Sequence, residues 1–234
     1  MPVAIITGGS KGLGRALGAA LAQRGWDLVL DARTAAVLEE TAAALERHGT
    51  RVVALPGDVT DAGHRADLVA AARDLGSLDL LVSNASALGA EPLLRLSELP
   101  LEGLRAALET NVVAALGLVQ TALPLLRTGS AGTPGAVIAV SSDAAAEAYG
   151  TWGGYGASKA ALDQLSAVLA VEEPSLRVWT VDPGDMRTDL YAAAVPGDDE
   201  PRPSPESVVP GFLRLVEERP VSGRYAAPAL LEAR

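Results

Sequence analysis

The sequence predicts an α/β fold in which helices cover both faces of a doubly wound parallel sheet. Two observations support this prediction: short apolar runs alternate with longer helical stretches, and a glycine-rich turn directly follows the first apolar run. The chain has 234 residues, of which 49% are hydrophobic and only 3% aromatic. This length suffices for one core built mainly from Ala, Val and Leu, so we expect a single domain over 1–234.

The expected strands are short apolar runs, typical of strands that are buried on both faces. They are Val3–Thr7, Asp27–Ala32, Arg51–Leu55, Leu78–Ser83, Ala136–Ser141 and Arg177–Val181. The stretches between them carry the Ala/Leu spacing of helices. They are Leu13–Arg24, Ala35–His48, Ala62–Leu75, Leu101–Leu126 and Tyr155–Val171. Pro124 is expected to mark a kink or the last turn of the fourth helix.

The composition changes after Leu190. Residues 196–210 hold five prolines and the acidic run Asp198-Asp199-Glu200, a combination that resists regular structure. A short helix from Glu206 to about Arg219 is expected next, followed by a last strand over Gly223–Ala226.

Charge and residue content exclude several classes of function. A formal net charge of −10 argues against nucleic acid as a partner, because phosphate contacts need a basic surface. Without cysteine there is neither a disulfide nor thiolate chemistry, and His48 and His64 lie in polar stretches, where we expect surface residues and no metal site. No uninterrupted apolar run reaches about 18 residues, and the first strand starts almost at Met1. We therefore expect neither a membrane span nor a signal peptide, and a cytoplasmic location.

A glycine-rich turn stands between the first strand and the first helix. It contains Gly8, Gly12 and Gly14 in the spacing Gly-x-x-x-Gly-x-Gly. Glycines at such a turn let the backbone approach a pyrophosphate, whose charge then lies at the helix N-terminus. A simple turn is the alternative, but the position directly after the first strand favours nucleotide binding.

A second motif lies in the predicted fifth helix. Tyr155 and Lys159 are four residues apart, which places them on one helix face, and Ser142 lies 13 positions before Tyr155. A nearby positive charge favours the phenolate and lowers the pKa of a tyrosine. Tyr155 could then exchange protons with an alcohol or ketone, while a serine hydroxyl holds the carbonyl oxygen. By itself the Tyr-x-x-x-Lys spacing is equally consistent with a solvated helix face.

Taken together, the motifs match the pattern of one known family in order and spacing. The chain from Val3 to about Thr188 resembles the short-chain dehydrogenase/reductase family, in its single-domain branch of about 250 residues. The residues that carry the resemblance are Thr7, Gly8, Gly12, Gly14, Asn84, Ala85, Asn111, Ser142, Tyr155, Lys159, Pro183 and Gly184. The family implies a Rossmann-like doubly wound parallel sheet, a nicotinamide cofactor, and hydride transfer to or from a carbon that bears oxygen.

The resemblance also implies four catalytic residues. Tyr155 would be the general acid of carbonyl reduction, and Ser142 would orient and polarise the carbonyl oxygen, with Ser141 as the alternative serine. Lys159 would lower the pKa of Tyr155 and bind the nicotinamide ribose. Asn111 would hold a water molecule of a proton relay, although a buried polar group bonded to backbone is the competing interpretation.

Most of the expected cofactor contacts come from the same resemblance. The residues are Gly8, Ser10, Lys11, Gly12, Leu13, Gly14, Arg33, Asp58, Val59, Asn84, Ala85, Tyr155, Lys159, Pro183, Gly184 and Thr188. Asp58 is expected to accept a hydrogen bond from the adenine amine, with a helix N-cap as its competing role.

Residues around the end of the second strand favour NADP(H) over NAD(H). An acidic residue there would bind the ribose 2′-hydroxyl of NAD, but the family pattern places Ala32 at that position. Arg33 and Lys11 could instead reach a ribose 2′-phosphate. Asp31 points to the opposite strand face from Ala32, yet a one-residue shift of the alignment would make it a selector for NAD.

The sequence specifies the substrate less closely than the cofactor. The expected pocket residues suggest an apolar, partly aromatic site for ketones, aldehydes or acyl thioesters; they are Ser86, Leu88, Ala144, Tyr149, Trp152, Met186 and Tyr191. By family resemblance, a segment at about 189–219 would cover the substrate as a lid, and the protein would form a homodimer or homotetramer. A catalytically silent NADP(H)-binding sensor or scaffold of the same fold is the alternative function.

Overall fold

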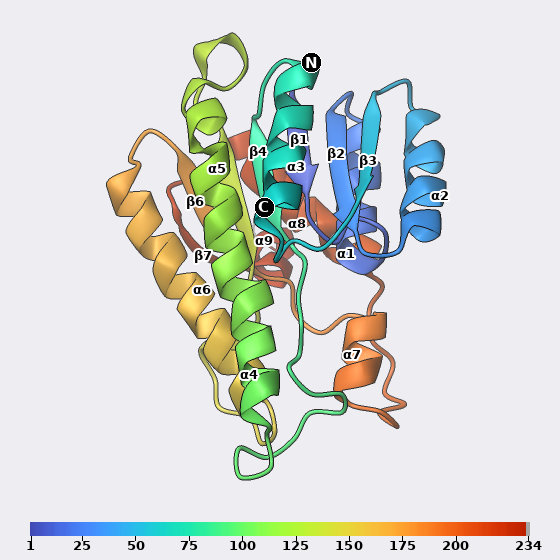
Figure 1. The fold of residues 1–234 in the computed structure, drawn as a ribbon, viewed down its shortest axis with the longest axis vertical. Coiled ribbons are helices and arrows are strands. Elements are labelled where there is room, and N and C mark those ends of the chain that lie inside the picture. The colour runs from blue at the N-terminus through green and yellow to red at the C-terminus, as the bar shows by residue number, and fades with distance from the viewer. Residues whose placement is uncertain (233–234) are drawn as a thin grey trace.

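The computed structural model, which describes residues 1–232, contains a seven-stranded sheet whose strands all run parallel. Its strand order is β3-β2-β1-β4-β5-β6-β7 (Figure 1). The strands are β1 Val3–Ile6, β2 Asp27–Ala32, β3 Val52–Pro56, β4 Leu80–Ser83, β5 Ala136–Val140, β6 Arg177–Asp182 and β7 Gly223–Ala226. The doubly wound parallel sheet predicted from the sequence is confirmed.

The strand order changes direction at β1. From β1 the chain moves outward to β2 and β3, and then returns to place β4 on the other side of β1. The register pairs Ala4 with Leu80 and Ile6 with Val82, so the carboxyl ends of β1 and β4 lie side by side. The loops that follow these two strands separate from each other and leave a crevice, which is where parallel α/β sheets bind ligands.

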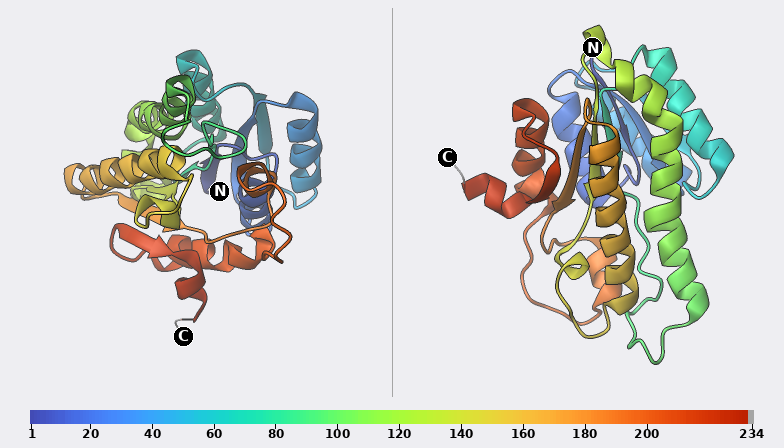
Figure 2. Two further views of the ribbon diagram at one scale, coloured as in Figure 1. Left: turned by 90° about the horizontal axis from the view of Figure 1, so that it is seen from below. Right: turned by 90° about the vertical axis from the view of Figure 1, so that its left-hand side faces the viewer.

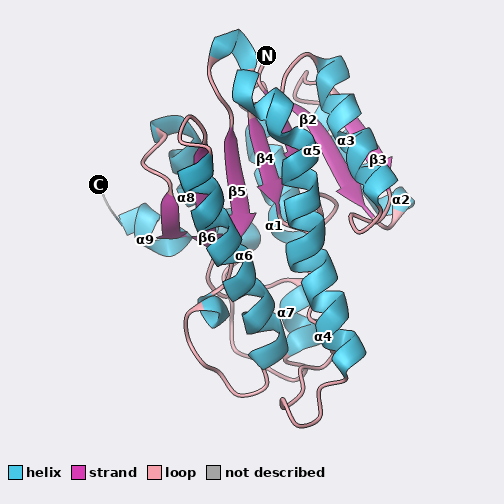
Figure 3. Ribbon diagram, turned by 60° about the vertical axis from the view of Figure 1, so that its left-hand side comes forward, coloured by secondary structure: helices cyan, strands magenta, loops and turns pink. Residues whose placement is uncertain are grey.

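Helices form a layer on each face of the sheet (Figure 2). They are α1 Gly12–Ala22, α2 Ala35–Glu46, α3 Ala62–Leu75, α4 Leu101–Leu108, α5 Ala115–Thr128, α6 Gly153–Glu172, α7 Asp189–Ala194, α8 Pro205–Glu218 and α9 Ala227–Glu232. Short segments of other helix types complete the set: the π-helical η1 Glu109–Ala114 and the 3₁₀ turns η2 Ser130–Gly132 and η3 Asp143–Ala145. Figure 3 shows α5 and α6 crossing in front of the strands, while α7 lies beyond their carboxyl ends.

Two apolar cores lie on the two faces, because side chains alternate between the faces along each strand. On one face, α1, α2 and α8 bury residues such as Leu17, Leu38 and Phe212 against even-numbered β1 residues, including Ile6. On the other face, α3 and α5 bury their apolar residues against odd-numbered β1 residues such as Ile5. Burial of both faces explains why the strands read as continuous apolar runs.

Most elements agree with the sequence expectations within one or two residues. Pro124 lies four residues before the end of α5, as expected for a last turn. Part of the proline-rich stretch, residues 205–210, is helical. Pro205 is tolerated in the first turn of α8, because the N–H that proline lacks would have no acceptor within the helix there. Two short helices, α7 and α9, were not predicted. Since α8 belongs to the core, only 189–204 of the expected lid segment is free to cover a site.

The longest helical segment of the described residues is continuous through three consecutive elements. Residues Leu101–Thr128, formed by α4, η1 and α5, are long and apolar enough to cross a membrane by length and composition alone. In the fold, Leu118, Ala122 and Leu126 of this helix are buried against the sheet. The segment therefore packs one face of α5 on the sheet, while other apolar residues such as Leu101 and Val113 are exposed.

Phe212 should be a major contributor to stability, because its ring is fully buried where α8 packs on the sheet. Phe212→Ala should lower the free energy of unfolding by about 3–5 kcal/mol, whereas Phe212→Leu should cost less than about 1.5 kcal/mol. Urea unfolding followed by circular dichroism measures both. Equal losses in the two variants would show that ring volume is not what stabilises this core.

Candidate active site

The glycine turn has the geometry of an anion-binding loop. Gly8 and Gly12 adopt positive φ angles of 64° and 50°, a conformation that side chains with a Cβ rarely adopt. Helix α1 starts at Gly12, so its first amide groups have no acceptor within the helix. These amides and the positive end of the helix dipole therefore face the crevice beside β4.

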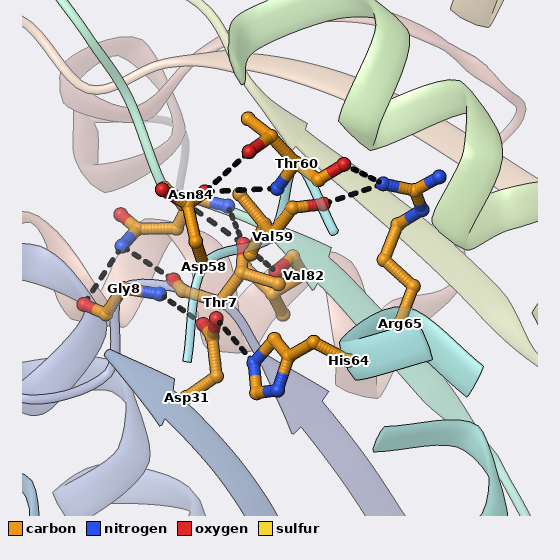
Figure 4. Close-up of polar contacts among 11 residues, drawn as sticks. Thr7, Gly8, Asp31, Asp58, Val59, Thr60, His64, Arg65, Val82 and Asn84 are labelled. Atoms are coloured by element: carbon orange, nitrogen blue, oxygen red, sulfur yellow. Dashed lines mark hydrogen bonds and ion pairs between the residues drawn. The ribbon is translucent and has the colours of Figure 1, made fainter. Parts of the chain in front are cut away.

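Close contacts hold this loop against the end of β4 (Figure 4). Asn84 Nδ2 donates to the carbonyl oxygens of Thr7 and Gly8 at 2.8 and 3.2 Å, and Thr7 Oγ1 accepts from the amides of Asn84 and Ala85 at 2.9 and 3.0 Å. A Cβ on Gly14 would lie 2.4 Å from the Gly8 carbonyl oxygen, so only glycine fits there. Gly14 and Asn84 thus shape the loop, and Asn84 also lines the cavity described below.

A buried carboxylate supports the loop from beneath. Asp31 Oδ1 accepts from the Gly8 amide at 2.8 Å, and its other oxygen lies 3.2 Å from His64 Nε2 (Figure 4). The side chain of His64 is only 10% exposed, so the expectation of a surface histidine was wrong. The hydrogen bond to Asp31 raises the pKa of His64, and Asp61 and Asp67 act in the same direction. Both Asp31 oxygens face protein groups, and Asp31 does not line the cavity described below; its alternative role as a selector for NAD stays a prediction.

Asp58 and Val59 lie apart from the cavity. Asp58 Oδ1 accepts from the amide and the hydroxyl of Thr60, and the amide bond lowers the pKa of Asp58. The N-cap of α3 is Asp61, which accepts from the Gly63 amide at 2.7 Å, so the capping role considered for Asp58 was wrong. The Asp58 side chain is exposed, and its expected hydrogen bond with the adenine amine stays a prediction.

Helix α6 presents Tyr155 and Lys159 to the carboxyl end of β5. The ammonium nitrogen of Lys159 lies 5.5 Å from the centre of the Tyr155 ring and donates to the Val140 carbonyl oxygen at 2.8 Å. Trp152 packs edge-on against Tyr155, with ring centres 5.7 Å apart. Ser142 is the second residue after β5 and directly precedes η3.

Burial controls the ionisation of this pair. Removal from solvent raises the pKa of Tyr155 to about 12, and the charges of Asp143 and Asp182 add to the effect. The same removal from solvent lowers the pKa of Lys159 to about 8. The rise for Tyr155 comes from burial and carboxylates, so the expected effect of Lys159 on the pKa of Tyr155 stays a prediction. At neutral pH Tyr155 keeps its proton, which is the form that a general acid needs.

Asn111 lies in the π-helical segment η1 behind this pair, and it is 1% exposed. Its side chain donates to Ala87 O and Ser158 Oγ, and it accepts from the Ala87 amide and from Ser86 Oγ. The amide group is therefore fully engaged with protein, as in the competing interpretation. The expected contact of this side chain with a relay water stays a prediction.

One cavity of about 330 Å³ connects the glycine loop with Tyr155. The sequence-predicted residues that line it are Gly8, Lys11, Gly12, Leu13, Arg33, Asn84, Ala85, Ser86, Leu88, Ser142, Trp152, Tyr155, Lys159, Pro183, Gly184, Met186, Thr188 and Tyr191. The predicted residues outside its lining are Ser10, Gly14, Asp58, Val59, Asn111, Ala144 and Tyr149. Ala144 packs behind Tyr155, and Tyr149 is 43% exposed with its hydroxyl bonded to Glu147.

Four carboxylates in the lining were missed by the sequence reasoning. They are Asp143, Asp182, Asp185 and Asp189. Each of these four carboxylates lies next to or within a motif that the sequence analysis recognised. This proximity in sequence was the signal that could have identified them. The expectation of an apolar, partly aromatic site is thus incomplete, because the cavity also holds negative charge.

Comparison with known proteins agrees with this geometry. A family model described as short chain dehydrogenase matches residues 2–199. The chain belongs to the short-chain dehydrogenase/reductase family. It is 35% identical over 191 residues to an uncharacterised oxidoreductase of Saccharomyces cerevisiae, covering 80% of this chain and 72% of the yeast protein. It is 36% identical over 174 residues to a 3-oxoacyl-[acyl-carrier-protein] reductase of rhamnolipid biosynthesis from Pseudomonas aeruginosa, covering 73% and 66% of the two chains.

Solved structures show the same architecture over the whole chain. An alcohol dehydrogenase of Thermococcus sibiricus, complexed with 5-hydroxy-NADP, has a TM-score of 0.86 at 26% identity and covers 97% of this chain and 95% of its own. A short chain dehydrogenase of Shigella flexneri, complexed with NADP, has a TM-score of 0.89 at 27% identity, with 97% of both chains covered. The protein is thus an oxidoreductase that acts on CH–OH or C=O groups.

The buried His64–Asp31 pair should make stability depend on pH. The pKa of His64 is raised in the folded state. The protonated His64 therefore stabilises the folded protein fully at a pH below its unfolded-state pKa, which is near 6.5, and this stabilisation is lost as the pH rises through the folded-state pKa. Between pH 6 and pH 9, the wild type should lose about 1 kcal/mol more unfolding free energy than His64→Gln. Urea titrations at both pH values measure this difference. Parallel behaviour of the two proteins would contradict the assignment.

Proposed function

We propose that the protein is an NADP(H)-dependent reductase that converts a ketone, aldehyde or acyl thioester carbonyl to an alcohol, with Tyr155 as the general acid. The observation that carries this proposal is the position of Tyr155, which is protonated at neutral pH and lines the same cavity as Ser142, Lys159 and the glycine loop. A bound nicotinamide cofactor would supply the hydride.

The residues of the cavity suit a dinucleotide. The glycine loop and the first turn of α1 offer amide groups to a pyrophosphate, and Gly12 leaves space beside them, because an added Cβ would touch only the Thr188 side chain at 3.4 Å. At the other end, Lys159 lies within reach of a ribose, and Pro183 and Gly184 border the space where a nicotinamide ring would lie.

In this mechanism the carbonyl carbon receives the hydride while its oxygen takes the proton from the Tyr155 hydroxyl, so that an alcohol is formed. Ser142 would donate a hydrogen bond to the same oxygen and polarise the carbonyl. Lys159 would hold the ribose hydroxyls and, in its protonated form, stabilise the tyrosinate that remains. Asn111 fixes the loop that carries Ser86, and its part in a proton relay stays a prediction.

Two cations support a preference for NADP(H). Arg33 is exposed at the end of β2, and Lys11 lies directly before α1. The ammonium of Lys11 is 2.9 Å from Asp189 Oδ2 on α7, so a ribose 2′-phosphate would compete with this exposed pair. The relatives of known structure that are complexed with NADP or 5-hydroxy-NADP point in the same direction.

The segment 189–204 is a suitable lid for the substrate. Leu190 and Ala194 of α7 pack against the apolar residues around Tyr155, which closes one side of the cavity. Arg202 ties the following loop together through contacts with Asp198 and the Tyr191 hydroxyl at 2.9 and 3.0 Å. We assign to this segment the role of admitting the substrate and excluding water.

A carbonyl panel with NADPH tests the proposed activity. NADPH oxidation is followed at neutral pH in the wild type, in Tyr155→Phe and with NADH in parallel. Tyr155→Phe should lower kcat by at least about 100-fold while the NADPH dissociation constant stays nearly unchanged, because only the proton donor is removed. Tight NADPH binding with no turnover of any carbonyl would instead favour a silent sensor, and substantial activity in Tyr155→Phe would exclude its role as the acid.

A double variant tests the cofactor preference. Lys11→Ala with Arg33→Ala should weaken NADPH binding by about 100-fold, because each charge-assisted hydrogen bond to the 2′-phosphate contributes about 1.5–3 kcal/mol. NADH, which lacks that phosphate, should lose much less. Isothermal titration calorimetry measures both dissociation constants, and equal losses for the two cofactors would refute the assignment.

A further inference from the structure

Three carboxylates border the part of the cavity where the substrate would lie. Asp143 directly follows Ser142, Asp182 is the last residue of β6, and Asp185 follows Gly184 in the next loop. They come from the ends of adjacent strands, whose carboxyl ends converge at one edge of a parallel sheet. The fold therefore gathers three negative charges beside Tyr155.

Asp143 is bonded to neutral donors, and Asp182 shares the guanidinium of Arg224 with Asp163. Asp143 Oδ1 accepts from Ser142 Oγ and from the Ala144 amide, which are neutral donors. Asp182 accepts from the Gly184 amide, and the guanidinium of Arg224 lies 3.7 Å away. Burial raises the pKa of Asp182, and the charge of Asp143 adds to this effect.

Asp185 shares its cation with two other carboxylates. Arg202 Nε lies 3.5 Å from Asp185 Oδ2, while the same guanidinium contacts Asp198 at 2.9 Å and Glu200 at 2.8 Å. One positive charge thus faces three negative ones. The Asp185 side chain is 52% exposed and lines the cavity, so its charge faces a ligand that enters there.

Of the three cations among the described lining residues, one lies beside Tyr155: the Lys159 ammonium, 5.5 Å from the ring centre. The other two, Lys11 and Arg33, lie at the end that would hold the cofactor phosphates, while Lys159 is buried against the Val140 carbonyl. The cavity is therefore divided into a positive end for phosphate and a negative end for substrate. A substrate with its own negative charge would be repelled at the second end.

The remaining walls of the negative end are apolar or neutral. Leu88, Trp152 and Leu190 cover it, which suits an apolar body. Ser141, 2% exposed and also part of the lining, has a hydroxyl without a hydrogen-bond partner in residues 1–232. A bound ligand or a water molecule beside it would satisfy this group.

We propose that the substrate is a carbonyl compound, or the corresponding alcohol, in which an apolar body carries a protonated amine, and that Asp185, with Asp143 and Asp182, binds this cation. The proposal rests on the proposed reductase function for the reacting carbonyl. The negative end of the cavity would then select a cationic substrate in preference to a neutral or acidic substrate of the same shape.

Matched acetophenones test the preference without depending on turnover. The probes are 3′- and 4′-(aminomethyl)acetophenone, their uncharged 3′- and 4′-ethyl isosteres, and 3- and 4-acetylbenzoate. Calorimetry measures their binding to the NADPH complex of Tyr155→Phe, and kcat/KM is measured in the wild type. At least one amine should have a dissociation constant about tenfold or more below that of its ethyl isostere. The benzoates should bind most weakly.

Two variants identify the source of the preference. Asp185→Asn should reduce the amine-to-ethyl ratio of dissociation constants severalfold, and 0.5 M salt should reduce it as well. The matched control Asp199→Asn removes a charge from the exposed loop after α7, outside the cavity, and should leave the ratio unchanged. A ratio near one, tighter benzoate binding, absence of amine binding at millimolar concentration, or an equal change in both variants would overturn the proposal.

The readouts also separate this proposal from the reductase function. Selective amine binding without turnover of any probe would support the cationic ligand and refute the reductase. Turnover of all probes at similar kcat/KM with similar dissociation constants would support the reductase and overturn the cationic substrate.

Discussion

Hydrogen bonds between Asn84 and the backbone of Thr7 and Gly8 join the ends of β1 and β4, and the site depends on this contact. The doubly wound order makes these two strands neighbours, although 77 residues separate Thr7 from Asn84. Gly14 packs against the same group, where an added Cβ would lie 2.7 Å from Asn84 Nδ2. Asp31 fixes the Gly8 amide from below, so the anion-binding end is rigid before any cofactor arrives.

Desolvation determines the chemistry at the other end of the cavity. Lys159 and Tyr155 lie close together, yet burial moves their pKa values in the directions that favour the uncharged forms, to about 8 and about 12. A protonated phenol beside a lysine of lowered pKa suits proton donation to a carbonyl oxygen. The charges of Asp143 and Asp182 strengthen this bias for Tyr155, and a positive charge on a bound ligand would reduce it.

The architecture could be predicted from the sequence because each strand is buried on both faces and each main helix on one. Those burial patterns leave apolar runs and Ala/Leu spacing that identify elements as different as β5 and α3. The six-residue helices α7 and α9 leave too few residues for a recognisable period. The prediction of a surface position for His64 was wrong for a related reason. Its polar neighbours in sequence do not reveal the contact with Asp31, which comes from strand β2.

The sequence by itself was sufficient to predict the fold and the family and to propose the residues of the reaction, because glycine spacing, the Tyr155–Lys159 pair and strand periodicity are local patterns. Only the tertiary structure decided which of those residues share one cavity and in which protonation state they stand. It also brought Asp143, Asp182 and Asp185 together at one edge of the sheet. Electrostatic energies depend on distance and burial, and both are set by strand order and packing, not by separation along the chain.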